Sequence, residues 1–582
     1  MSFDLVIRGG TVFDGTGAPP IAADVGVKDG RIVAVGRNLP PGAEEIDASG
    51  LMVTPGWVDI HTHYDGQITW DSRMTPSSTL GATTVVAGNC GVGFAPVRKG
   101  DEDTLVRLME GVEDIPGAAL HEGLKWNWES FAEYMDAVDT LPHDIDVAVQ
   151  VPHGALRVYV MGERGANRDD ATAEEAAEMR RLTAEAIRAG ALGFSTTRTM
   201  VHRTADGDLT PTLGAARHEM EQIAAGLADA GSGVLQWVSD FAPDIDAEFQ
   251  LIRDLTRIAG QPLSFSMVQA DVVPDQWRRL SERLDQAVAE GFPLKAQIAG
   301  RPVGLMLGLQ GSAHPFISRP SYAEIADLPL DQKVARMKDP AFRARLIAEA
   351  PARGHPFINS LAGAHHKMYA IEGDHLDYEP DPSTSLGARA KALGVNPDEL
   401  VYDALIADEG RAFLFFPMHN YVEGSLDNVR AMIANPNTLS GLSDGGAHVG
   451  AICDVSLPTF MLTHWCRDRT RGPRFELPET IRAQTKDTAE AVGLLDRGVI
   501  APGYLADLNV IDFDRLKLKV PYMVYDLPTG ARRLMQDAEG YVATIKSGQV
   551  IYREGQATGA LPGKLIRGRQ AAPTSPTALA AE

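Results

Sequence analysis

Both ends of the chain alternate apolar and polar positions, which is the two-residue period of a β-strand with one buried face. The stretches with this pattern are residues 3–12, 22–36, 507–511, 541–545 and 549–552. Lys28-Asp29-Gly30 supplies the tight turn that a hairpin needs, and Ser547-Gly548 supplies another near the end. We therefore expect residues 1–54 and 491–562 to build one small β-sandwich from both termini.

Between these segments the pattern changes to an amphipathic helix followed by a short apolar strand. Residues 172–189 begin with Thr172 and Glu175 in the spacing of a capping box, and Gly190 ends the helix before an apolar run. The same order of helix, glycine and short apolar strand recurs at Gly231, Gly260 and Gly291. It predicts parallel strands joined by crossover helices. A closed barrel and an open doubly wound sheet share this cadence, so it does not choose between them.

Two further segments do not follow this alternation of helix and strand. Residues 300–420 are rich in Pro and Gly, and we expect an irregular insertion that lies as a lid over the catalytic end of a barrel. Residues 563–582 end in APTSPTALAAE, which predicts a disordered tail. A chain of 582 residues exceeds one ordinary core, so we expect a catalytic barrel over residues 55–490 beside the smaller β domain.

Charge and cysteine content exclude several classes of protein. The 54 Lys and Arg against 78 Asp and Glu give a formal net charge of −24, which disfavours binding to nucleic acid or to anionic membranes. The three cysteines form no CxxC pair and are too few for a disulfide framework. The N-terminus does not have the layout of a signal peptide, and no run of about 18 apolar residues occurs. We expect a cytoplasmic protein.

The first chemical motif is VTPGWVDIHTHYDG at residues 53–66, an apolar strand that runs into His61 and His63. Side chains two residues apart on a strand point to the same face, so these histidines can bind one metal ion through two imidazoles. An HxH pair alone is a weak signal, because most such pairs are ordinary surface or core histidines. Its flanking residues make it stronger.

GWVDIHTHYDG resembles the signature of the amidohydrolase superfamily, whose two histidines at the end of the first strand of a (β/α)₈ TIM barrel bind divalent metal. Four further segments together resemble its N-acyl-D-amino-acid deacylase branch: GATTVVAGNCGVGFAP (81–96), VPHGALRVYVMG (151–162), GALGFSTT (190–197) and LSGLSDGGAH (439–448). The resemblance covers most of residues 1–560. It decides the fold in favour of the barrel.

The resemblance implies roles for two more residues. Asp444 lies at the end of the apolar run expected for the last barrel strand, where the superfamily has an aspartate that is both metal ligand and general base. Its alternative role is to shape a Gly-rich turn. Cys90 stands where the deacylase branch uses a cysteine ligand at the end of strand two, although a buried free cysteine is often only a small apolar residue.

The chain departs from the deacylase pattern at strands five and six. Histidines are expected there in segments resembling THMR and SHxK, but the chain reads LQWVSD (235–240) and LSFSMVQ (263–269). The lysine that recognises the substrate carboxylate is also missing. Amide, aromatic and hydroxyl side chains are poor zinc ligands, so we predict one Zn²⁺ per chain, or another divalent metal, held by His61, His63, Asp444 and Cys90.

Four other residues are candidates for substrate binding because they follow predicted strands. His153 ends strand three, Arg198 and His202 follow strand four, and His448 lies four residues past Asp444. A cationic side chain after strand four could stabilise an oxyanion. The alternative is that these residues cap loops, pair with nearby carboxylates or support a ligand from behind.

We therefore predict a metal-dependent hydrolase that cleaves the C–N bond of a small, partly apolar N-acyl amide with Asp444 as general base. Two alternatives stay open: a cyclic amidase or deaminase of the same superfamily, and a non-catalytic protein that kept the barrel. Related barrels often form homo-oligomers, which we take as an expectation by analogy alone.

Overall fold

The structure is a computed structural model that describes residues 2–352, 356–441 and 443–574. Its centre is an eight-stranded parallel sheet that curls into a barrel. The strands, in spatial and chain order, are β6 (Trp57–Asp59), β7 (Ala82–Ala87), β8 (Asp146–Pro152), β9 (Gly193–Arg198), β10 (Leu235–Ser239), β11 (Leu263–Ser266), β12 (Leu294–Ile298) and β16 (Thr438–Ser440). Backbone pairing of Thr62 with Gly445 joins the last strand to the first. The predicted TIM barrel is confirmed.

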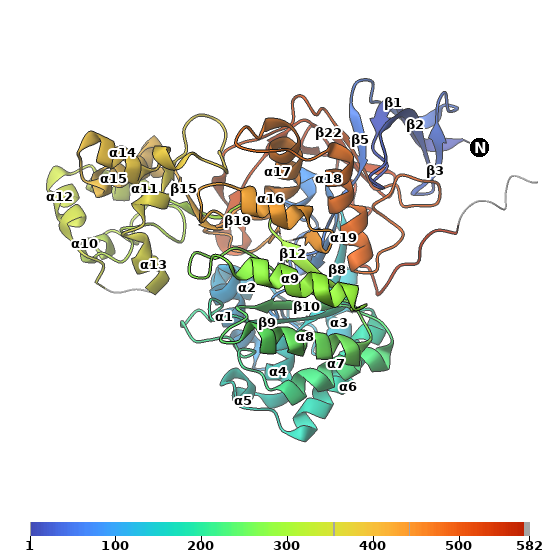
Figure 1. The fold of residues 1–582 in the computed structure, drawn as a ribbon, viewed down its shortest axis with the longest axis horizontal. Helices are drawn as coiled ribbons and strands as arrows, with labels where there is room; N and C mark the ends of the chain where they lie inside the picture. The colour runs from blue at the N-terminus through green and yellow to red at the C-terminus, as the bar shows by residue number, and fades with distance from the viewer. Residues whose placement is uncertain (1, 353–355, 442, 575–582) are drawn as a thin grey trace, which may run out of the picture.

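Helices cover the outside of the barrel, as the cadence predicts (Figure 1). They include α4 (His153–Met161), α6 (Ala173–Ala189), α7 (Arg217–Ala230), α8 (Ile245–Ala259), α9 (Gln276–Ala289), α16 (Asp427–Ala434), α17 (Leu457–Thr463), α18 (Leu477–Gln484) and α19 (Lys486–Ala491). The capping box of Thr172 and Glu175 begins α6, and Gly190 ends it with a left-handed φ of 118°. The sequence signals therefore set this helix at both ends.

The connection between β7 and β8 contains three helices. These are α1 (Glu102–Glu113), α2 (Gly117–Gly123) and α3 (Phe131–Asp139). The side chain of Asp114, the residue after α1, accepts a hydrogen bond from the backbone N–H of Gly450 at 3.2 Å. This contact fixes the end of α1 against the loop that follows the last barrel strand.

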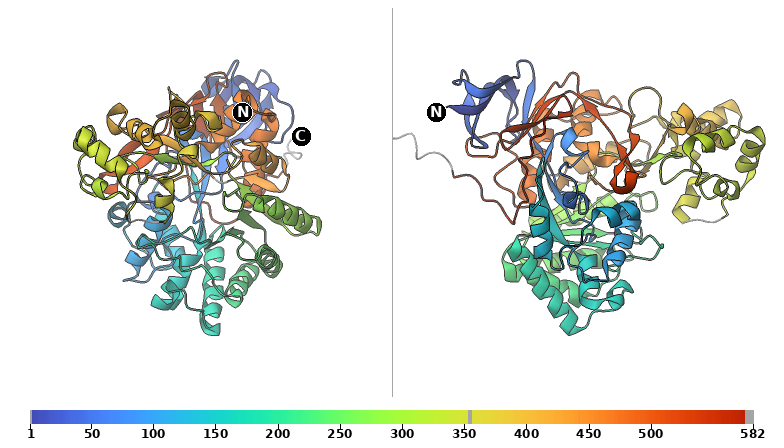
Figure 2. Two further views of the ribbon diagram at one scale, coloured as in Figure 1. Left: turned by 60° about the vertical axis from the view of Figure 1, so that its left-hand side comes forward. Right: turned by 180° about the vertical axis from the view of Figure 1, so that it is seen from behind.

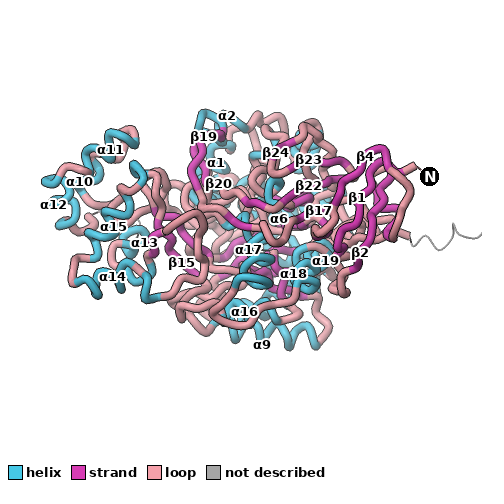
Figure 3. Tube along the Cα trace, turned by 90° about the horizontal axis from the view of Figure 1, so that it is seen from above, coloured by secondary structure: helices cyan, strands magenta, loops and turns pink. Residues whose placement is uncertain are grey.

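Both termini build one β domain, as the alternating pattern predicts. Its nine strands form a single continuous sheet: β1 (Phe3–Val12), β2 (Ile21–Lys28), β3 (Arg31–Gly36), β4 (Gly42–Asp47), β5 (Met52–Pro55), β17 (Leu508–Ile511), β22 (Tyr541–Lys546), β23 (Gln549–Arg553) and β24 (Gln556–Ala557). The backbone N–H of Ala506 donates to the carbonyl of Gly30, so the sheet closes around its own apolar core. Figure 3 shows these strands together at one end of the molecule.

The segment between β12 and β16 is more ordered than the expected irregular insertion. It contains β13 (Val303–Leu307), α10 (Pro320–Ala323), α11 (Leu330–Met337), α12 (Pro340–Ala348), α13 (Pro356–Leu361), β14 (Tyr369–Ala370), α14 (Leu386–Leu393), α15 (Pro397–Leu405) and β15 (Leu414–His419). These elements pack around an apolar cluster of their own. The Pro and Gly residues of this segment separate short helices. Its helices lie to one side of the barrel in Figures 1 and 2. The role of this segment as a lid stays a prediction.

The predicted disordered tail begins too early in the sequence. Residues 563–570 pair with the barrel: Val147 donates to the carbonyl of Lys564, and Ile566 donates to the carbonyl of Val147. Ile566 is 5% exposed and belongs to an apolar cluster with strands of the barrel. Residues 575–582 of the predicted tail lie outside the described residues. No helix among the described residues is long and apolar enough to span a membrane.

Candidate metal centre

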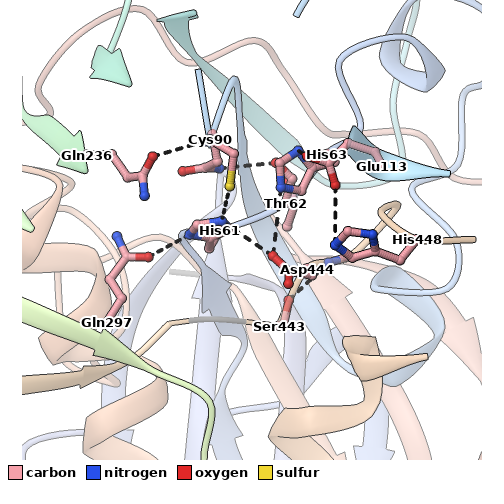
Figure 4. A network of polar contacts seen from close by, with 12 residues as sticks. His61, Thr62, His63, Cys90, Glu113, Gln236, Gln297, Ser443, Asp444 and His448 are labelled. Atoms are coloured by element: carbon pink, nitrogen blue, oxygen red, sulfur yellow. Dashed lines mark hydrogen bonds and ion pairs between the residues drawn. The ribbon is translucent and has the colours of Figure 1, made fainter. Parts of the chain in front are cut away.

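Two buried histidines form the centre of the site (Figure 4). His61 and His63 follow β6 directly and are 0% and 2% exposed. The intervening Thr62 donates its backbone N–H and its hydroxyl to the carbonyl of Val86, and His63 donates its backbone N–H to the carbonyl of Gly445 at 2.8 Å. Burial lowers the pKa of His61 to about 4 and also lowers the pKa of His63. Both rings are therefore neutral near pH 7, which is the form that binds metal.

Cys90 approaches the two histidines from the end of β7. Its Sγ lies 3.3 Å from Nε2 of His61, and one ligand atom each from His61, His63 and Cys90 lie within 4.8 Å of one another. The backbone of Cys90 has a left-handed φ of 53°, and its N–H donates to Oε1 of Gln236 at 3.0 Å. This hydrogen bond supports the turn that aims the sulfur inward.

Asp444 completes the group from the loop after β16, the strand that lies next to β6 in the closed barrel. Its Oδ1 lies 3.3 Å from Nε2 of His61 and 3.7 Å from Nε2 of His63. Burial raises the pKa of Asp444, and the nearby His448 partly offsets this effect. The four side chains offer nitrogen, sulfur and oxygen atoms that suit a zinc-like divalent ion.

Neither ring nitrogen of His63 has a hydrogen-bond partner among the described residues. Buried polar atoms are rarely left unpaired in a native protein, and each exception calls for an explanation. A metal ion among these four side chains would take Nε2, the nitrogen that faces Asp444, while Nδ1 lies 3.2 Å from Oε1 of Glu113. The residues present therefore fit the metal that the sequence predicts.

Strands β10, β11 and β12 bring amide and hydroxyl groups to the same interior. Oε1 of Gln297 accepts a hydrogen bond from Nδ1 of His61 at 2.7 Å, and Nε2 of Gln297 donates to Oγ of Ser264 at 2.8 Å. Gln236 bonds the backbone of Cys90. These strands thus contact the candidate ligands without adding another histidine.

Two of the predicted substrate-binding residues face the group. His202 contacts Oγ1 of Thr197 at 2.9 Å through Nδ1. Burial is the main cause that lowers its pKa to about 3, with smaller contributions from His448 and His61. His448 lies 3.6 Å from Glu113, and burial lowers its pKa too.

The other two predicted substrate-binding residues pair with carboxylates, so their role in substrate binding stays a prediction. His153 is fully buried, with Nδ1 2.8 Å from Oγ1 of Thr196 and Nε2 2.7 Å from Glu219. Arg198 donates through Nε to Glu248 at 2.8 Å and lies over the ring of Trp237. Both residues lie at the ends of their strands, as the sequence predicts. Acidic residues on α7 and α8 pair with their side chains.

A mostly apolar cavity opens beside His63 and Asp444. The hairpin of β19 (Tyr522–Leu527) and β20 (Ala531–Met535) forms one wall, since Leu534 donates its backbone N–H to Val449. Apolar lining residues are Trp70, Ile115, Val449, Ile452, Leu527 and Leu534. Arg533 also lines the cavity, but its guanidinium is paired with Asp526.

Sequence reasoning missed Glu113 and Gln297. Glu113 ends the helix after β7, with Oε1 3.2 Å from Nδ1 of His63. Its signal was an acidic residue on the apolar stripe of that helix, four positions after Met109 and eight after Leu105. Gln297 lies in a strand whose glutamine gives no separate signal.

Comparison with known proteins places this geometry in a family. The model of the Amidohydrolase family matches residues 44–552. A D-aminoacylase of Alcaligenes xylosoxydans xylosoxydans is 27% identical over 569 residues, covering 97% of each chain. A D-aminoacylase structure described with a binuclear metal centre has a TM-score of 0.64 at 24% identity, covering 97% of this chain and all of that one.

A second solved structure is an N-acyl-D-glutamate deacylase from Bordetella bronchiseptica, complexed with zinc and a phosphonate inhibitor. It has a TM-score of 0.64 at 22% identity and covers 97% of this chain and 100% of that chain. The family match and the deacylase relatives make the chain a metal-dependent hydrolase of carbon–nitrogen bonds other than peptide bonds, in the D-aminoacylase-like branch. On this evidence the chain belongs to the amidohydrolase family.

Proposed function

We propose that the protein is a single-metal amidase that hydrolyses linear N-acyl compounds, as N-acyl amino acid deacylases do. One observation carries the proposal: ligand atoms of His61, His63 and Cys90 lie within 4.8 Å of one another, and Oδ1 of Asp444 lies within 3.7 Å of Nε2 of both histidines. The facing strands contribute Gln236, Ser264 and Gln297, which do not supply a second set of zinc ligands.

His61, His63, Cys90 and Asp444 would hold the metal, with zinc as the favoured ion. A divalent metal bound there supplies Lewis acidity, which acidifies water and polarises an amide carbonyl. Asp444 is the base: its carboxylate takes a proton from the attacking water and returns it to the leaving nitrogen. The products are a carboxylate and an amine.

The cavity supports a substrate with an apolar group. Its apolar lining favours an aliphatic or aromatic acyl chain or side chain next to the scissile amide. A substrate with a free α-carboxylate is less favoured. The lysine that would recognise this group is missing, and Arg533 is already paired with Asp526. We assign His202 and His448 to the polar end of the substrate.

Elemental analysis of purified wild type, His61→Ala and Asp444→Ala tests this proposal. We expect about one zinc-like ion per wild-type chain and less than one in both variants. Two ions per wild-type chain would contradict the single-metal reading, and none would favour the non-catalytic alternative.

A substrate panel then separates the enzyme alternatives. It contains N-acyl amino acids of both hands, uncharged N-acyl amines, hydantoins and lactams. We expect hydrolysis of linear amides with an apolar acyl chain. Turnover of hydantoins or lactams alone would instead favour the cyclic amidase.

A further inference from the structure

Glu113 is a buried carboxylate beside the candidate metal centre and is absent from the predicted ligand set. It is 1% exposed. Its Oε1 lies 3.2 Å from Nδ1 of His63, and its Oε2 lies 3.6 Å from Nε2 of His448. Neither carboxylate oxygen makes a hydrogen bond to a described residue. Figure 4 shows Glu113 between the two histidines, on the side of His63 away from Cys90.

Folding stability alone does not explain a carboxylate at this position. Glu113 is the last residue of α1, where the negative end of the helix dipole disfavours an acidic side chain. Burial of a charge without a partner is costly. The ion-pair contacts of Glu113 within the described residues are with His63 and His448, and burial keeps those imidazoles neutral. A nearby cation would supply the missing compensation.

The surroundings of His61 show what Glu113 can do for His63. His61 turns Nε2 toward Asp444 and Cys90, while its Nδ1 bonds Gln297 on the far side of the ring. His63 repeats this arrangement: Nε2 faces Asp444 and Nδ1 faces Glu113. Partners on the outer nitrogen fix the tautomer and orientation of metal-binding histidines and raise their basicity.

The neighbouring residue explains how Glu113 reaches this place. Asp114 accepts a hydrogen bond from Gly450, in the loop that also holds Asp444 and His448. Asp114 has the left-handed φ of 52° that ends α1. Two consecutive acidic residues thus connect the end of α1 with the loop that carries the proposed base.

We propose that Glu113 is a positioning residue of the metal centre: it accepts the Nδ1–H of His63, turns Nε2 toward the metal and balances the charge of the bound ion. The inference rests on the proposed function, because it needs a metal at His61 and His63. Glu113 acts through His63 and touches neither metal nor substrate.

The test is zinc titration of metal-depleted, full-length protein by calorimetry. The variants are Glu113→Ala, which removes the acceptor and the charge, and Glu113→Gln, which keeps an acceptor as Gln297 does for His61. Glu102→Gln, at the start of the same helix, is the control. We expect Glu113→Ala to weaken zinc affinity about 10- to 100-fold, the usual effect of losing such a partner. Glu113→Gln should weaken it less, and the control should match wild type.

Thermal unfolding of the same proteins separates positioning from a merely structural role. Without zinc, Glu113→Gln should melt at or above the wild-type temperature, because it removes an uncompensated buried acid, whereas its stabilisation by zinc should be smaller. Should Glu113→Ala fail to fold, the Gln variant decides alone. Wild-type zinc affinity in the Glu113 variants would overturn the inference and leave the proposed function standing. A wild-type chain that binds no zinc would overturn both.

Discussion

The two halves of the barrel interior carry different chemistry at the same depth. Strands β6, β7 and β16 lead to His61, His63, Cys90 and Asp444, whereas β10 to β12 present amide and hydroxyl groups. Gln236 and Gln297 are each 2% exposed, as deeply buried as His63. Burial therefore does not distinguish a ligand from a supporting residue here. The chemistry of the side chain distinguishes them.

We call the residues after β6, β7 and β16 the ligand half, because they are the proposed ligands, and the residues on β10 to β12 the supporting half. The supporting half forms hydrogen bonds with the ligand half. Gln297 bonds His61, and Gln236 bonds the backbone of Cys90. A buried N–H left without an acceptor costs about 1–3 kcal/mol. The amides thus satisfy groups that the ligands present on their outer sides. Strands without candidate ligands can therefore still support the residues that the other strands supply.

The strongest test of the comparison is Asp444→Asn, which keeps the shape of the side chain and removes the base. We expect kcat/KM for an N-acyl amide to fall by about 10²- to 10⁴-fold, the range for loss of general acid–base catalysis. Circular dichroism should show an unchanged fold. Asp408→Asn, in an exposed carboxylate far along the insertion, is the control. Near-wild-type activity of Asp444→Asn would remove this residue from the ligand half.

A second test uses the fact that the histidines titrate and the amides do not. The pKa of His61 is about 4 in the folded, metal-free chain and 6.5 when exposed. A lowered histidine pKa means that the unfolded chain binds the proton first, so this residue destabilises the fold as pH falls from 6.5 toward 4. Above pH 6.5 it contributes no pH dependence.

The expected slope from His61 is about 1.4 kcal/mol per pH unit within that window. Urea unfolding of metal-depleted wild type and His61→Gln at several pH values measures it, and the variant should show the shallower dependence. Zinc should not reduce the slope in wild type near pH 6, because the folded ring is already neutral without the metal. Equal slopes for the two proteins would show that His61 is not buried as a neutral group.

Most of the fold and the two histidines of the candidate site could be predicted because their signals are local. The capping box at Thr172 and the turn at Asp29 and Gly30 act within a few residues. His61 and His63 share a face because of strand geometry alone. Cys90 and Asp444 needed the family resemblance, since no spacing along the chain brings them to the histidines.

The supporting half could not be predicted because its partners are distant in sequence. Gln297 is 236 residues from His61, and no pattern near either residue indicates their contact. His153 and Arg198 lie at the ends of strands, as predicted, but no local pattern indicates that Glu219 and Glu248 pair with them. The start of the predicted tail is ordered, against the prediction, because Leu565 and Ile566 are buried although the segment around them is polar.

Substitution of the two buried amides, Gln297 and Gln236, should have milder effects than substitution of Asp444. Gln297→Leu removes the acceptor for Nδ1 of His61 and should weaken zinc affinity by at least about tenfold, as for other partners of metal-binding histidines. Gln236→Leu leaves the Cys90 N–H unpaired and should mainly lower stability, by about 1–3 kcal/mol. Zinc titration and urea unfolding of both variants separate the two effects. If Gln236→Leu abolished metal binding as His61→Ala should, Gln236 would be a ligand, and the division into a ligand half and a supporting half would be wrong.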